Sequence, residues 1–327
     1  MYRAPALLED ILLRYLIGID GGGTKTAICA ACACDFLLSY TETSGTSWRE
    51  HGPSGVAGKL KKSVDELIGE GQIAGIAIWL PCHGESIEGD QAVEQAIRKE
   101  FPGVPIYFSN DVEVGWAGSL ALEPGINIVA GTGSIAFGKD IHGKTARGGG
   151  WSEFFSDEGS CYWMGRKVLE LFSKQADGRI PKDALYEVVY RKFGLSDDFE
   201  IVDIVHERYI PSREKVASLQ LLAKEAALLG SQCSISLYIE AAGELCLIIT
   251  AIKNQLDFDS KPFNVSYTGG LFKADKLILP HFSRKIEEIG GKLITPRLKP
   301  EEGALLLAYQ HFYPDGLEGA KKAICIP

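Results

Sequence analysis

The chain contains 327 residues, of which 46% are hydrophobic and 24% are charged. This composition is typical of a globular protein and excludes a disordered chain. The formal net charge of −9 argues against nucleic-acid binding and polybasic membrane binding, because both need a positive surface. An anionic substrate would therefore have to be bound locally, by backbone N–H groups or a metal ion.

The N-terminal region does not resemble a secretory signal. Residues 1–14 contain Arg3, Glu9 and Asp10 and lack a long apolar centre, although a short helix after Pro5 is possible. No run of about 18 apolar residues predicts a membrane span. The eight cysteines do not suggest a disulfide framework in a chain of this length without a signal. We therefore expect a cytoplasmic protein.

The first third of the chain begins with short apolar runs separated by glycines, a pattern that predicts an antiparallel meander. We expect its strands at residues 15–20, 25–34 and 35–41. Helical and strand patterns then alternate. They predict a helix at 53–69, a strand at 73–80, a helix at 90–101 and a strand at 104–109.

The pattern then starts again. A strand at 126–130 leads into Gly131-Thr-Gly-Ser134 and a strand to Phe137, which echoes the strand at 17–20 followed by its own glycine turn. Two glycine hairpins can also arise by chance. Because the downstream order of strands and helices matches as well, we interpret the two halves as an internal duplication.

The remainder of the chain is mainly helical before it returns to strands. We expect helices at 162–174, 182–193, 199–206, 212–229, 234–254, 274–279, 283–289 and 301–311, and strands at 265–268 and 292–295. Strands that alternate with helices predict an α/β fold, with an antiparallel edge in each half. The Pro124–Gly125 pair marks a plausible hinge.

Two glycine turns could bind phosphate. The first follows Asp20 and continues into Thr24, and it matches neither a Walker loop nor a glycine motif that opens a helix. Its N–H groups and the Thr24 hydroxyl could contact phosphates, and Asp20 could hold Mg²⁺ through waters. The alternative is a tight hairpin with a solvated acid. With the second turn at 131–134, the pair suggests a triphosphate held from both sides of a cleft.

Three further segments could carry chemistry. Asp111 ends a predicted strand, where it could accept a hydroxyl proton or, more commonly, cap the next helix. The glycines before Trp151, together with Asp157 and Glu158, could form a polyol site, or the acids could cap the helix near residue 160. The backbone at 269–270 could lie against a flat base or merely turn.

The cysteines give weaker signals. Cys29, Cys32 and Cys34 form C-x-x-C-x-C, but Cys29 and Cys32 face opposite sides of a predicted strand, which disfavours a metal site. We interpret Cys82-His83 as loop, because adjacent residues seldom face each other.

Five motifs in order resemble the sugar-kinase/Hsp70/actin superfamily, and most closely the N-acetylglucosamine kinase-like branch of the BadF/BadG/BcrA/BcrD ATPase family. They lie at residues 19–25, 110–111, 130–134, 149–160 and 268–272. The resemblance covers residues 15–311. It implies a duplicated ribonuclease-H-like, actin-like ATPase fold with ATP and Mg²⁺ in an interdomain cleft. We expect one domain at 1–120, joined by a C-terminal helix at about 302–327, and a larger domain at 121–301 with a helical insertion.

The resemblance also implies a role for each motif residue. Asp111 matches the catalytic base, and Asp20 would hold Mg²⁺ through water. The implied ATP-binding residues are Gly21, Gly22, Gly23, Thr24, Lys25, Gly131, Thr132, Gly133, Gly269 and Gly270. The implied substrate-binding residues are Thr46, Asn110, Ser134, Gly150, Trp151, Ser152 and Asp157. Some positions depart from the family pattern: Thr46 replaces a frequent Asn, Ile135 a frequent polar Asn, and Ser152 a usual Gly.

We therefore expect an ATP-dependent kinase for a sugar hydroxyl, most simply the 6-OH of N-acetylglucosamine or a related hexose. We expect the protein to form a homodimer and to bind a small-molecule sugar as its substrate. We expect it to bind neither nucleic acid nor a membrane. Two alternatives stay open. One is an ATPase activator of a radical acyl-CoA dehydratase or reductase, for which Cys161 would be the nearest cluster ligand but the Cys-Gly-Gly signature is missing. The other is a non-catalytic regulator that senses ATP or sugar.

Overall fold

The computed structural model describes residues 14–23, 25–33, 35–81, 83, 86–259 and 262–324, with Asp111 described by its backbone alone. The possible helix after Pro5, Thr24, Cys34 and Cys82 lie outside the described residues. The chain divides into two compact units. Unit 1 combines residues up to Glu123 with those from Pro296 onward, and unit 2 is Pro124–Thr295. The sequence predicts domain boundaries between residues 120 and 121 and between residues 301 and 302.

Unit 1 is built on a five-stranded mixed sheet in the order β3-β2-β1-β4-β5. Its strands are β1 (Arg14–Gly21), β2 (Lys25–Cys32), β3 (Leu38–Ser44), β4 (Gln72–Trp79) and β5 (Ile106–Phe108). The first three strands form the antiparallel meander that the sequence predicts, whereas β4 and β5 run parallel to β1. The carboxyl ends of β1, β4 and β5 therefore share one edge of the sheet.

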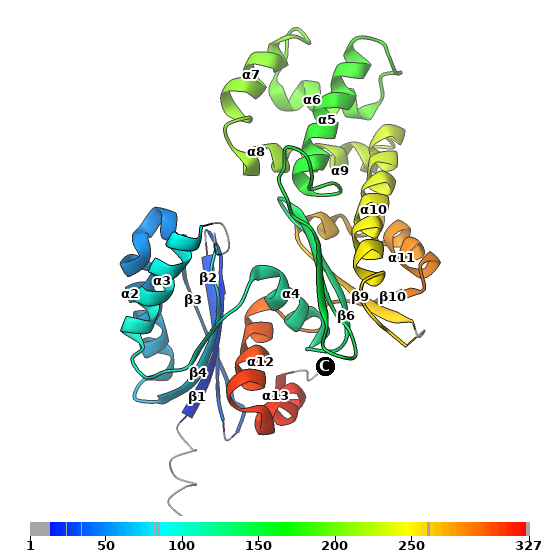
Figure 1. Ribbon diagram of the computed structural model, residues 1–327. Helices are drawn as coiled ribbons and strands as arrows, with labels where there is room; N and C mark the ends of the chain where they lie inside the picture. The colour runs from blue at the N-terminus through cyan, green and yellow to red at the C-terminus, as the bar shows by residue number, and fades with distance from the viewer. Residues whose placement is uncertain are drawn as a thin grey trace, which may run out of the picture. The chain divides into compact units, whose positions relative to one another are not determined.

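Helices cover both faces of this sheet (Figure 1). They are α2 (Trp48–Ile68), α3 (Ile87–Glu100), α4 (Asp111–Leu120), α12 (Pro300–Phe312) and α13 (Leu317–Ile324), with a short 3₁₀ turn η2 at Pro314–Gly316. One face of β1 buries Ile17 and Ile19 in a core with residues of α2 such as Leu60 and Val64. The other face lies against α12, the helix from the end of the chain.

Unit 2 repeats the topology of unit 1. Its strands are β6 (Gly125–Ala130), β7 (Ser134–Lys139), β8 (Thr145–Gly149), β9 (Phe263–Thr268) and β10 (Gly291–Leu293). The order β10-β9-β6-β7-β8, taken from the opposite edge, is the same succession as in unit 1. The predicted α/β fold and the internal duplication are thus confirmed. The strand β8 is missing from the sequence prediction, because its two glycines and one arginine give no alternating apolar pattern.

The helices of unit 2 are mostly those expected from the sequence. They are α5 (Cys161–Ala176), α6 (Ala184–Phe193), α7 (Glu200–Arg208), α8 (Arg213–Ser218), α9 (Gln220–Leu228), α10 (Gln232–Lys253), α11 (Leu279–Glu288) and the 3₁₀ segment η1 (Gly270–Leu277). The prediction of a single helix at 212–229 is wrong, because the helix is interrupted at Leu219, between α8 and α9. There the N–H group of Leu219 bonds to the carbonyl of Val216, three residues back, which tightens the turn.

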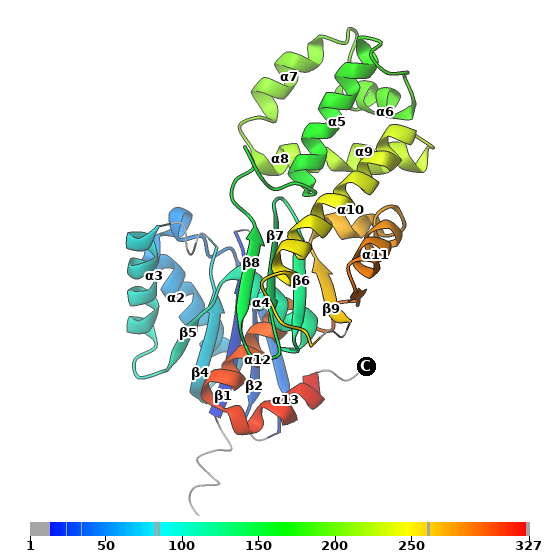
Figure 2. The same ribbon diagram turned by 45° about the vertical axis from the view of Figure 1, so that its right-hand side comes forward.

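Helix α10 runs through the core of unit 2 (Figure 2). By length and composition it could span a membrane. Its buried side chains, however, follow the spacing of one helical face, with Leu237, Ala241, Leu245 and Ile249 packed into the unit 2 core. These features identify α10 as a core helix.

Candidate active site

The carboxyl edge of the unit 1 sheet gathers the first group of predicted site residues. Asp20 at the end of β1 lies in register with Trp79 at the end of β4. The N–H group of Ser109, just after β5, donates to the carbonyl of Ile78 on β4 over 2.8 Å. Parallel strands thus bring Asp20 and the start of α4 at Asp111 to the same edge, on either side of β4.

The first glycine turn is packed too tightly for side chains at Gly21 and Gly22, but not at Gly23. A Cβ atom on Gly21 would lie 2.5 Å from the carbonyl oxygen of Trp79, and one on Gly22 would lie 2.4 Å from the carbonyl oxygen of Lys25. At Gly23, by contrast, a Cβ atom would meet no atom within 4 Å. The turn therefore presents open backbone at Gly23, and the predicted partner Thr24 lies outside the described residues.

Two predicted ligand contacts in unit 1 have partners within the protein. Thr46 is fully buried, and its hydroxyl lies 2.8 Å from the hydroxyl of Thr26. Its N–H group donates to the carbonyl of Gly22 over 3.1 Å, so Thr46 ties the segment before α2 to the first glycine turn. Lys25 forms an ion pair with Glu42 on the neighbouring strand, and both side chains are mostly exposed.

The helix cap before α4 is Asn110 and not Asp111. The side-chain oxygen of Asn110 accepts a hydrogen bond of 2.8 Å from the N–H group of Glu113. The alternative that Asp111 serves as the cap is therefore wrong, and Asp111 is the first residue of the helix. Negative charge is favourable in that first turn.

The junction between β5 and α4 contains a residue that the sequence prediction missed. The Glu113 carboxylate accepts hydrogen bonds of 2.8 Å from the hydroxyls of Tyr107 and Ser109. Burial, with the nearby Glu113 charge, raises the pKa of Tyr107 well above its usual range. The Tyr107 ring stacks on His311 of α12, with centroids 3.8 Å apart. The spacing Asn110-x-x-Glu113 is a capping pattern that could have indicated this cluster.

In unit 2, the second glycine turn is held against the start of α5. The N–H group of Gly131 donates to the carbonyl of Gly133 over 2.9 Å. The carbonyls of Gly131 and Thr132 accept hydrogen bonds of 2.9 and 3.3 Å from the N–H groups of Cys161 and Tyr162. The turn therefore has a defined shape, and a Cβ atom on Gly131 would meet no atom within 4 Å.

Asp157 links the predicted sugar segment to this turn. Its carboxylate accepts from the N–H group of Ser134 over 3.2 Å, and its side chain is 2% exposed. The Ser134 hydroxyl donates to the carbonyl of Glu158 over 2.7 Å. The cap of α5 is Ser160, which accepts from the N–H group of Trp163, so the alternative that Asp157 and Glu158 only cap this helix is wrong.

The Gly269-Gly270 pair lies beside the second glycine turn. Because β9 runs parallel to β6, Thr268 lies in register with Val129 near the ends of the two strands. Gly269 has a φ of +107°, and a Cβ atom there would lie 2.3 Å from the carbonyl oxygen of Ala130. Only glycine fits both the conformation and this close approach.

The predicted sugar-contact residues around Trp151 lie in an exposed turn. Gly150 has a φ of +66°, and a Cβ atom there would lie 2.6 Å from the side chain of Ile135. The side chain of Trp151 is 79% exposed, as are most of Phe154 and Phe155. The Ser152 hydroxyl accepts from the N–H group of Phe154 over 3.2 Å.

The cysteine motifs are described only in part, because Cys34 and Cys82 lie outside the described residues. Cys29 and Cys32 are buried in β2, and burial raises the pKa of Cys29 to about 12. Among the residues that the structure describes, no group of three possible metal ligands comes together. His83 lies 3.0 Å from the Glu94 carboxylate and stacks on Phe108.

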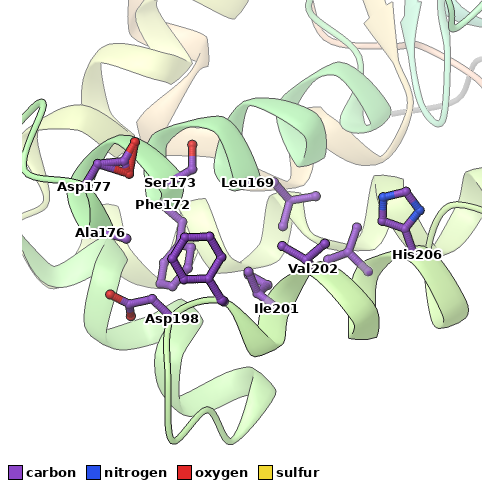
Figure 3. A pocket seen from close by; sticks show the side chains of 11 residues that line it. Leu169, Phe172, Ser173, Ala176, Asp177, Asp198, Ile201, Val202 and His206 are labelled. Atoms are coloured by element: carbon purple, nitrogen blue, oxygen red, sulfur yellow. The ribbon is translucent and has the colours of Figure 1, made fainter.

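A cavity of about 470 Å³ lies elsewhere, between α5 and α7 (Figure 3). Its lining is mainly apolar, with Phe172, Ile201 and Val202 among its walls and His206 at one end. None of the predicted site residues lines it.

The chain is similar to known proteins along most of its length. A sequence model of the BadF/BadG/BcrA/BcrD ATPase family matches residues 17–308. The chain is 28% identical over 308 residues to the N-acetylmuramic acid/N-acetylglucosamine kinase of Clostridium acetobutylicum, covering 90% of this chain and 98% of the relative. It is 29% identical over 309 residues to the N-acetyl-D-glucosamine kinase of Dictyostelium discoideum, covering 89% and 97%.

The fold is also similar to that of a solved structure, a candidate N-acetylglucosamine kinase from Chromobacterium violaceum. The TM-score is 0.70 with 24% sequence identity, and the match covers 90% of this chain and 99% of the other. At this level of identity, the similarity supports the shared fold.

Proposed function

Because the chain belongs to the BadF/BadG/BcrA/BcrD ATPase family, we propose that it is an ATP-dependent sugar kinase that phosphorylates the 6-hydroxyl of N-acetylglucosamine or a related hexose. The observation that carries the proposal is the match, along nearly the full length of both relatives, to two kinases whose names share N-acetylglucosamine.

The two glycine turns fit a nucleotide. At Gly23 and Gly131, open space adjoins the backbone. At Gly22 and Gly269, neighbouring backbone lies so close that a side chain would not fit. Backbone N–H groups beside such open space are suited to phosphate oxygens, except that of Gly131 itself, which donates to the carbonyl of Gly133. We propose that the backbone of each turn contacts ATP, with Lys25, Thr132 and Gly270 as further contacts.

Magnesium fits this arrangement through Asp20. A single carboxylate at a strand end is enough for an ion that keeps several waters and is bound mainly by substrate phosphates. Bound Mg²⁺ would neutralise charge on the phosphates during transfer.

Asp111 is the proposed general base. It opens α4 at the edge of the sheet that also carries Asp20, and Asn110 fixes the first turn of that helix. In this role Asp111 accepts the proton of the sugar hydroxyl as the hydroxyl oxygen attacks the terminal phosphorus of ATP. The phosphoryl group passes to the sugar, and ADP leaves.

The sugar itself is proposed to contact the segment at 150–157 and the residues beside the base. Trp151 offers an exposed aromatic face and Ser152 a hydroxyl group. Asp157 and Ser134 are buried and bonded within the protein, so we assign them to holding this segment in place. The Thr46 hydroxyl already bonds to Thr26, so we assign Thr46 to holding the first glycine turn, through the hydrogen bond from its N–H group to the carbonyl of Gly22.

The alternative function as an activator of a radical dehydratase has less support. Such an activator needs accessible thiolates for an iron–sulfur cluster. Cys161 is buried within unit 2, and burial raises the pKa of its thiol to about 11.

A coupled assay of ADP release over a panel of sugars tests the proposed kinase. N-acetylglucosamine should be turned over, and its 6-deoxy analogue should not. Product analysis by ³¹P NMR should show a 6-phosphate. Replacement Asp111→Asn should lower kcat about 10²- to 10⁴-fold, the range for loss of a general base. Sugar-dependent turnover that survives this replacement would remove Asp111 as the base, and sugar binding without turnover would favour a regulator.

We propose that the enzyme acts in the cytoplasm as a homodimer. Light scattering of the purified protein across a range of concentrations should give twice the mass of one chain. A monomeric mass at all concentrations would exclude the homodimer.

A further inference from the structure

An arginine side chain, that of Arg213, extends from the helical part of unit 2 to the second glycine turn. The guanidinium group of Arg213 forms an ion pair and hydrogen bond with the carboxylate of Asp157. A Cβ atom on Gly133 would lie 2.7 Å from the same guanidinium and 2.9 Å from the Asp157 carboxylate. Arg213, Asp157 and the turn are therefore in direct contact.

The packing of α8 on α5 brings Arg213 to this position (Figure 2). Arg213 is the first residue of α8, and Ser212 caps that helix by accepting from the N–H group of Lys215. The two helices approach so closely that a Cβ atom on Gly165 would lie 2.0 Å from the carbonyl oxygen of Val216. Glycine at position 165 thus sets the distance between α5 and α8.

The charged groups around Arg213 indicate that it holds a carboxylate of the protein and not a phosphate. Besides Asp157, its guanidinium lies 3.7 Å from the carboxylate of Glu153. A cation with two acidic neighbours is poorly suited to bind a phosphate of its own. It is well suited to hold a carboxylate, because charge-assisted bonds are stronger and more directional than neutral ones.

Asp157 is therefore held from two sides. One carboxylate oxygen accepts from the N–H group of Ser134, and the other accepts from Arg213. Ser134 is the last residue of the glycine turn at 131–134. The hydrogen bond from Ser134 therefore links the Asp157 carboxylate to that turn.

We propose that Arg213 is a positioning residue that fixes Asp157 against Ser134 and thereby couples sugar binding to nucleotide binding. This inference rests on the proposed sugar-kinase function and adds to it a residue from the helical insertion. Arg213 acts through Asp157 and makes no contact of its own with the reacting atoms.

The test compares Arg213→Gln and Arg213→Lys with the wild-type protein. The matched control is Arg191→Gln, which removes an exposed arginine paired with Glu225 in the same helical part of unit 2. Three quantities are measured: kcat, the KM for N-acetylglucosamine, and the Kd of a non-hydrolysable ATP analogue by calorimetry with and without sugar. Thermal unfolding identifies variants that do not fold.

We expect Arg213→Gln to raise the sugar KM at least tenfold, to change kcat less, and to weaken the ATP analogue at least threefold. Arg213→Lys should restore part of each loss, and Arg191→Gln should stay within twofold of wild type. If Arg213→Gln does not fold, the same comparison is made with Arg213→Lys, which keeps the charge and loses the planar fork.

Two results would overturn the inference. A folded Arg213→Gln within twofold of wild type in both sugar KM and analogue Kd excludes a positioning role, and a change in sugar KM alone excludes the coupling. A wild-type protein that turns over no sugar would instead refute the proposed function. In that case, comparing the Kd of the ATP analogue between Arg213→Gln and wild type still tests whether Arg213 holds the glycine turn.

Discussion

Gly118 on α4 and Gly303 on α12 meet backbone to backbone in unit 1. A Cβ atom on Gly303 would lie 2.3 Å from the amide nitrogen of Gly118, and one on Gly118 would lie 2.6 Å from the carbonyl oxygen of Lys299. The same helix passes over β1, where a Cβ atom on Gly18 would lie 2.1 Å from the amide nitrogen of Leu305. Glycines therefore set how closely α12 packs on both α4 and the sheet.

Replacement of Gly118 by alanine should destabilise the protein. The added methyl group forces α4 and α12 apart, and overpacking of this kind costs about 1–3 kcal/mol. The matched control is Gly58→Ala in α2, where a Cβ atom meets nothing within 4 Å. That control should be neutral or more stable by about 0.5–1 kcal/mol. Urea unfolding measures both, and equal stability of Gly118→Ala and wild type would contradict the packing argument.

Replacement of Glu113 by alanine should lower kcat about tenfold, a moderate misplacement of the proposed base. The Tyr107 and Ser109 hydroxyls would lose their shared acceptor, and the junction that leads into Asp111 would loosen. Glu113→Gln keeps one acceptor oxygen and should lose less. The control Glu66→Ala removes an exposed carboxylate of α2 and should leave kcat unchanged. Steady-state kinetics in which Glu113→Ala equals this control would exclude a positioning role for Glu113.

Asp183 should make stability depend on pH. Burial by itself would raise the pKa of this carboxyl, but hydrogen bonds from Gln175, Ser231 and the N–H group of Leu185 outweigh burial and lower it below 3.8. A lowered pKa in the folded state gives stability that is fully present above the unfolded value and lost as pH falls through the folded value.

The replacement Asp183→Asn should therefore lower the free energy of unfolding by about 1.5–3 kcal/mol at pH 7, as expected for hydrogen bonds to a charged group. The difference from wild type should stay constant down to about pH 5 and shrink below pH 4. Urea unfolding at pH 7, 5 and 3.5 measures it. A difference that does not change with pH would show that the charge of Asp183 contributes nothing.

The thiol of Cys161 should react slowly in the folded protein. Burial raises its pKa from 9.0 to about 11, which lowers the thiolate fraction near neutral pH roughly a hundredfold. Alkylation with iodoacetamide at pH 8, followed by peptide mass spectrometry, should show slow labelling in buffer and fast labelling in urea. Equal rates would mean that the thiol is accessible, which would revive the activator hypothesis.

Local patterns predicted much of the fold. The glycine turns at 21–23 and 131–134 follow buried strands, and their repetition along the sequence predicts the duplication. The strand β8 and the helix break at Leu219 escaped prediction, because neither carries a clear local signal: β8 has no alternating apolar pattern. β8 forms by pairing with β7, and no glycine or proline marks residue 219.

The candidate site was predictable where it follows strand ends and not where distant segments meet. Asp20, Asp111 and Ser134 lie beside strands that the apolar pattern identifies. Arg213 is separated from Asp157 by 56 residues, and nothing in the local sequence around either residue indicates the pair. Only the packing of α8 on α5 brings them together.

The division of unit 1 into two stretches of chain has a consequence for synthesis on the ribosome. The strands β1 to β5 emerge early, yet α12, which covers one face of their sheet, follows all of unit 2. Unit 2 is continuous and can mature first, while the earlier sheet waits with one apolar surface bare. A premature stop codon before Pro296 would spare unit 2 and leave the nascent sheet open to aggregation.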